Sequence, residues 1–68
     1  SNEFKQEGKV VVEIRVNAGG NVISAKLIGG TISDRQTIQL ALDAAKKAKF
    51  TEGEHDQIGT ITYTFKFN

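Results

Sequence analysis

The closing stretch of the chain, GTITYTFKFN, alternates without interruption between polar and apolar side chains. The polar set is Thr60, Thr62, Thr64 and Lys66, and the apolar set is Ile61, Tyr63, Phe65 and Phe67. A period of two residues is typical of a β-strand with one buried face and one solvent-exposed face. The fold therefore depends on which strands pair with this one and on what covers its apolar side.

The chain has 68 residues, the size of one small domain with a thin margin of stability. It has no cysteine, so disulfides, thiolate metal sites and thiol nucleophiles are excluded. The formal net charge of +1 provides no strongly basic surface for nucleic acid or anionic lipid. No apolar run is long enough to span a membrane. We interpret Ser1 and Asn2 as a remnant of tag cleavage and expect residues 3–68 to form a single domain.

Two segments near the start of the chain also have the pattern of strands. KVVVEIRV, residues 9–16, places Val10, Val12, Ile14 and Val16 on one face. NAGGN, residues 17–21, predicts a chain reversal in which Gly19 and Gly20 can supply positive φ. VISAKLI, residues 22–28, predicts a second strand. Its inward set is expected to be Ile23, Ala25 and Leu27, although the opposite set, with Val22 and Ile28, is nearly as apolar.

Residues 34–49 have the spacing of an amphipathic helix. Its apolar stripe consists of Ile38, Ala41, Leu42, Ala45 and Ala48. Ser33 and Gln36 stand at capping-box spacing, with Asp34 in the first turn. Lys46, Lys47 and Lys49 lie at the other end, where the helix dipole favours cations. We expect Phe50 to anchor the chain as it leaves the helix and residues 51–57 to form a polar loop.

The order strand, strand, helix, strand predicts an α+β domain of ββαβ topology. Strands one and two form a hairpin, and the helix returns the chain across one face of the sheet. The valine-rich first strand is expected in the middle, so the predicted order of the antiparallel sheet is 2-1-3. The aromatic residues of strand three would then belong to the core beneath the helix. Val11, Val22 and Ile28 would share the other face with the threonines of strand three.

The residues able to carry chemistry do not predict an enzyme, a metal site or a cofactor. His55 lies in a loop with Glu52, Glu54 and Asp56, but a metal site needs converging ligands and no second histidine is present. Acid–base catalysis by paired carboxylates requires that their environments give them different pKa values, and the sequence predicts no burial that would do this. The hydroxyl residues lack the context of a nucleophile elbow.

Two binding alternatives receive weaker support than structural interpretations. GGTISD, residues 29–34, could cradle a phosphate before a helix, but Asp34 places negative charge there and no P-loop lysine is present. Tyr63, Phe65 and Phe67 could stack bases, but RNA-recognition sheets carry their aromatic residues on an open face with basic neighbours. We therefore predict a strand-to-helix turn and a core strand, and no nucleic-acid partner.

Strand three is predicted to be an edge strand, and one side of its backbone has no partner within the chain. Such an edge is either a hazard to be blocked or a docking site for an added strand. Lys66 is the only charged residue of this strand that could discourage pairing with another strand. The candidate partner-binding edge is Thr60, Ile61, Thr62, Tyr63, Thr64, Phe65 and Lys66.

Several stretches together resemble the TonB C-terminal domain family. EGKVVVEIRVNAGGNVISAKLIGG resembles the start of that domain, RQTIQLALDAAKKAKF is similar to its alanine-rich helix with a basic and aromatic end, and GTITYTFKFN resembles its closing strand. The resemblance covers residues 7–68 and is nearest to TonB-like envelope proteins of Bacteroides-type bacteria. Two positions depart from the family pattern, because Ala48 replaces a tryptophan and no proline follows Phe50.

The resemblance implies a periplasmic binding module whose parent chain is anchored in the inner membrane. It implies that the closing strand captures the TonB box of outer-membrane transporters by strand addition, so that energy from the inner-membrane motor complex reaches the transporter. An alternative stays open, in which the same edge pairs with a second copy as a homodimer in an envelope assembly protein unrelated to transport.

Overall fold

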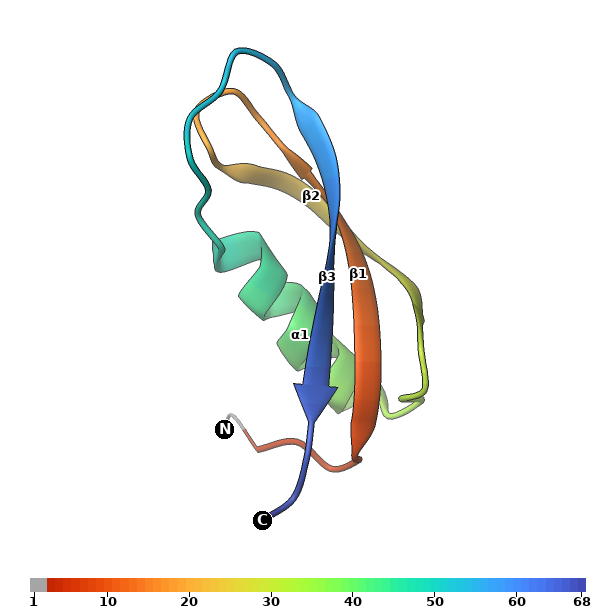
Figure 1. Ribbon diagram of the computed structural model, residues 1–68. Helices are drawn as coiled ribbons and strands as arrows, with labels where there is room; N and C mark the ends of the chain where they lie inside the picture. Colours follow the sequence, from red (N-terminus) through yellow and green to blue (C-terminus); the bar gives the residue numbers. More distant parts are fainter. Residues whose placement is uncertain (1–2) are drawn as a thin grey trace.

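The computed structural model describes residues 3–68, and the interpretation of Ser1 and Asn2 as a tag remnant lies outside the described residues. These residues form β1 (Gly8–Val16), β2 (Val22–Gly30), α1 (Arg35–Lys47) and β3 (Gln57–Phe65). Helix α1 crosses one face of the sheet, and the segment before β1 lies near the segment after β3 at one end of the molecule (Figure 1). The fold is an elongated two-layer domain with one uncovered sheet face.

The sheet has the order β2-β1-β3, with β1 antiparallel to both neighbours. This arrangement confirms the predicted ββαβ topology and the central place of the valine-rich strand. The pairing of β1 with β3 is regular from Gly8 opposite Phe65 to Val16 opposite Gln57. β3 therefore begins and ends two or more residues earlier than the predicted closing strand, and Lys66 and Phe67 follow it.

The second strand differs from the prediction because its pairing with β1 contains two register shifts. Val16 lies opposite Val22, whereas Arg15 lies opposite Ser24, so Ile23 is the extra residue of a bulge. Val22 packs against the core and Ile23 is 51% exposed. The expected inward place of Ile23 and outward place of Val22 were therefore wrong, while the inward place of Ala25 is confirmed.

The core lies between β1 and α1. Its buried apolar side chains are Val10, Val12, Ile14, Ile32, Ala41 and Ala45. Alanines on the helix permit close approach to the sheet, and α1 packs mainly on β1 and β2. The helix therefore does not lie over β3, and Ile61, Tyr63 and Phe65 are only partly buried.

The prediction that Phe67 belongs to the core was wrong. Phe67 is 55% exposed, lies beyond the end of β3 and stacks on Phe4 with 5.2 Å between ring centroids. Phe4 also meets Phe65 edge to face at 5.1 Å. The Phe67 N–H donates to Glu7 Oε1, so the segment before β1 holds the end of β3.

The N-terminal segment also completes the start of the helix. Gln6 Oε1 accepts hydrogen bonds from the N–H groups of Ser33 (2.9 Å) and Asp34 (2.8 Å). Asp34, rather than the expected Ser33, is the N-cap, and its Oδ2 accepts from the N–H of Thr37 at 2.9 Å and from its hydroxyl at 2.7 Å. Thr37 is fully buried, and its Oγ1 accepts from the Lys5 N–H. The helix ends at Lys47, with Lys46 and Lys47 in its last turn as predicted.

Acid is expected to weaken this cap. The two hydrogen bonds from Thr37 hold the pKa of Asp34 below its ordinary value of 3.8. Because the pKa is lower in the folded chain, the stabilisation is complete above the unfolded value and is lost as the pH falls through the folded value. We expect urea denaturation to show a larger loss of stability between about pH 6 and about pH 2.5 in the wild type than in Asp34→Asn. An equal loss in both proteins would contradict this role of the carboxylate.

Candidate functional site

The free edge of β3 can be assigned from the hydrogen bonds of β1. The Lys9 N–H donates to Thr31 Oγ1, and the Lys9 carbonyl accepts from the Thr31 N–H at 2.8 Å, so both main-chain groups of Lys9 point toward the β2 side. The Asn17 N–H points the same way, because it donates to the Asn21 carbonyl. Main-chain groups alternate sides along a strand. Even-numbered residues of β1 therefore direct their main-chain groups toward β3.

The register then separates the residues of β3 into two sets. The partners of the even-numbered β1 residues are Gln57, Gly59, Ile61, Tyr63 and Phe65, whose main-chain groups face β1. The residues between them, Ile58, Thr60, Thr62 and Thr64, direct their N–H and carbonyl groups away from the sheet. These four residues form the free edge, and three of them were in the predicted partner-binding set.

The four residues of the free edge direct their side chains to the same face of the sheet. Thr60, Thr62 and Thr64 are exposed on the face that the helix does not cover. Ile58, beside Arg15 on that same face, is 64% exposed. An added strand would extend this threonine-rich face with every second side chain.

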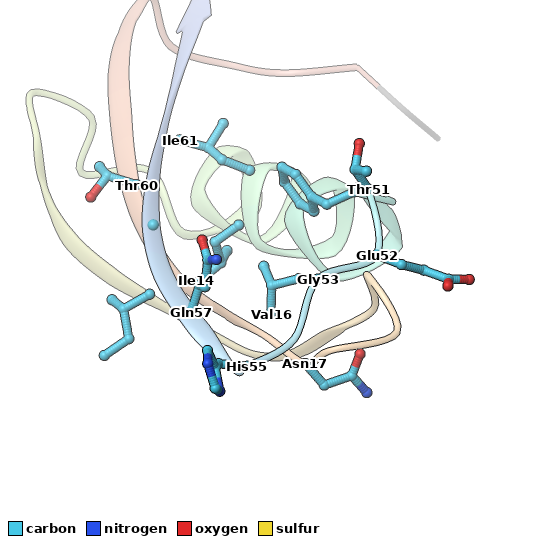
Figure 2. A pocket seen from close by; sticks show the side chains of 13 residues that line it. Ile14, Val16, Asn17, Thr51, Glu52, Gly53, His55, Gln57, Thr60 and Ile61 are labelled. Carbon is cyan, nitrogen blue, oxygen red and sulfur yellow. The ribbon is translucent and has the colours of Figure 1, made fainter.

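The other face of β3 borders a groove of about 480 Å³ between β3 and the chain that leaves α1. Figure 2 shows Ile14, Val16 and Ile61 directed into the space between the sheet and the helix. Phe50, 43% exposed, also lines the groove. Its expected anchoring role is fulfilled by the backbone, because the Phe50 N–H donates to the Gly20 carbonyl at 2.9 Å.

A second groove, of about 400 Å³, continues along β3 toward its C-terminal end. Leu40, Ala44 and Lys47 of α1 line one side, and Tyr63 and Phe65 line the other. Desolvation raises the pKa of the Tyr63 phenol above its ordinary value of 10. An added strand would therefore place its other set of side chains next to apolar surface along the length of β3.

The structure provides no support for the alternative chemistries. Among residues 3–68, no group of three histidine, cysteine or acidic side chains is arranged to hold a metal ion. The N–H groups of Ser33 and Asp34, which a phosphate would need, donate to Gln6 instead. Tyr63 and Phe65 lie on the helix side of the sheet, away from the open face that a base-stacking sheet requires.

Several parts of the site were not predicted from the sequence. The predicted edge treated residues 60–66 as equivalent, whereas only alternate residues direct main-chain groups outward, and Lys66 lies beyond the strand. The grooves were missed because the apolar stripe of a helix identifies the face turned to the sheet but not the strands that it covers. The contact of Phe4 with Phe65 was also missed, because its sequence signal is a single apolar residue, Phe4, before the first strand.

The family model of the Gram-negative bacterial TonB protein C-terminal domain matches residues 2–68 of the chain. Comparisons with curated proteins and with solved structures give no significant match. In the described part of the chain, no helix is long and apolar enough to cross a membrane.

Proposed function

Because the chain belongs to the TonB C-terminal domain family, whose members are periplasmic protein-interaction domains without enzymatic activity, we propose that it captures an extended peptide by strand addition to the free edge of β3. The observation that carries the proposal is the outward direction of the main-chain groups of Ile58, Thr60, Thr62 and Thr64. These groups offer four N–H donors and four carbonyl acceptors in a regular row. A peptide strand pairs with such a row largely independently of its side chains.

The proposed partner is the TonB box of an outer-membrane transporter. The parent chain would be anchored in the inner membrane and would connect its motor complex to the captured box. Main-chain pairing explains how one such domain can serve several transporters, while side chains beside Thr62 and Tyr63 adjust preference. The proposed role is transmission of energy for nutrient uptake.

Titration with a peptide of the TonB-box type tests this proposal. In dilute solution, the amide signals of Thr60, Thr62 and Thr64 are expected to shift, and their N–H groups should become protected from hydrogen exchange. The N–H groups of Ile61 and Tyr63 are expected to be protected already, because they face β1. This alternation along β3 is the specific signature of an added strand.

A peptide that leaves β3 unchanged at high concentration would contradict peptide capture. A dimer that forms with rising protein concentration, protects the same alternate residues and ignores the peptide would support the assembly alternative instead. Sedimentation at two protein concentrations, with and without peptide, separates these outcomes.

A further inference from the structure

Negative charge is concentrated at one end of the groove beside β3. Glu52, Glu54 and Asp56, which we call the acidic rim, are exposed in the segment that leads into β3. Glu52 lines the groove itself, and Figure 2 shows its side chain directed outward into solvent. Apolar side chains, including Phe50 and Ile61, lie on the inner side of the same groove.

Several basic side chains of the domain have other partners or line other parts of the surface than the acidic rim. Lys49 Nζ donates to Asn21 Oδ1 at 2.8 Å, beside the turn between β1 and β2. Arg15 belongs to the opposite, open face of the sheet, where it lies across from Ile58. Lys47 and Lys66 border the far part of β3, together with Asp43 and Glu7. Charge along the edge is therefore uneven, with its acidic end at the start of β3.

We propose that the strand captured by β3 carries a lysine or arginine beside the acidic rim, next to an apolar side chain that enters the groove. This inference rests on the proposed function and adds the chemical class of the partner. A long basic side chain can lay its alkyl stem along apolar surface and hold its charge in water, which suits a groove with an apolar floor and a charged rim. Charges at the edge of an interface chiefly determine specificity and association rate.

Three capped peptides of equal length test the charge. They share an alternating valine and serine core that spans β3 and differ in one residue at one end, which is lysine, norleucine or glutamate. One series carries this residue at the N-terminal end and a second at the C-terminal end, so that either strand direction presents it to the acidic rim. We expect the lysine peptide to bind about tenfold more tightly than the glutamate peptide in one series, with norleucine between them, at low ionic strength.

A triple variant, Glu52→Gln with Glu54→Gln and Asp56→Asn, is expected to reduce this preference to less than about twofold. The matched control is Glu13→Gln, which removes a carboxylate from the open face of the sheet, away from the acidic rim. Glu13 faces Lys26 across that face at 3.7 Å. The control should retain the preference for lysine.

The outcomes distinguish this inference from the proposed function. Peptides that bind equally well in both series would overturn the charge preference and leave strand capture standing. A preference that survives in the triple variant would place its origin elsewhere and would also overturn the inference. If none of the peptides binds, both the proposed function and the inference fail.

Discussion

Proline at residue 61 is expected to unfold the domain, whereas proline at residue 62 is expected to leave it folded and unable to pair with an added strand. The Ile61 N–H faces β1 opposite Val12, so Ile61→Pro removes a ladder hydrogen bond and inserts a ring between the strands. The carbonyl group left without its partner alone costs about 1–3 kcal/mol, which is a large part of the stability of a domain of this size. The Thr62 N–H points outward, where proline is tolerated on an edge strand.

Circular dichroism and peptide titration together measure this pair of variants. Thr62→Pro should retain the native spectrum and bind peptide at least about tenfold more weakly, because it loses a donor and its ring obstructs the incoming strand. Ile61→Ala and Thr62→Ala are the controls for side-chain loss. Ile61→Ala should fold with reduced stability, and Thr62→Ala should still bind. A folded Ile61→Pro with an unfolded Thr62→Pro would reverse our assignment of the free edge.

The order of the elements could be predicted from the sequence because each has a strong period. The alternation in β1 and β3 and the helical stripe from Ile38 to Ala45 each define one buried face, and the only good partner for two flanking strands is the valine-rich one. The register of β2 could not be predicted in the same way. Both of its faces are apolar, and the bulge at Ile23 places Val22 rather than Ile23 on the core side at the point where the hairpin closes.

Contacts between distant residues account for most of what the sequence did not show. The capping of the helix depends on Gln6, and Phe67 packs on Phe4 rather than on the core. These pairs have no local pattern, because nothing in a short window relates residues so far apart. The candidate site could be predicted in part. The exposed edge follows from the strand order, but the direction of its N–H groups follows only from an observed hydrogen bond such as that between Lys9 and Thr31.

In the turn between β1 and β2, the sequence alone could not identify the glycine that the backbone conformation requires. The sequence offered Gly19 and Gly20 equally as positions of positive φ, but only Gly20 adopts it, at φ 85°. A Cβ at Gly20 would overlap the carbonyl oxygen of Phe50, which passes close to the turn. The Phe50 N–H donates to the Gly20 carbonyl, and the Gly53 N–H donates to the Ala18 carbonyl, so this turn supports the chain that lines the groove.

Gly20→Ala is therefore expected to destabilise the domain by about 3 kcal/mol, because backbone strain and a clash between main-chain groups add together. Gly19→Ala is the matched control, since a Cβ there would meet only the side chains of Asn17 and Asn21 at 3.4 Å. It should change the free energy of unfolding by less than about 1 kcal/mol. Urea denaturation measures both variants. If Gly20→Ala still folds, its peptide affinity should also fall, because the displaced Phe50 segment forms one wall of the groove. Unchanged stability and unchanged peptide affinity would contradict the contact between the turn and the helix exit.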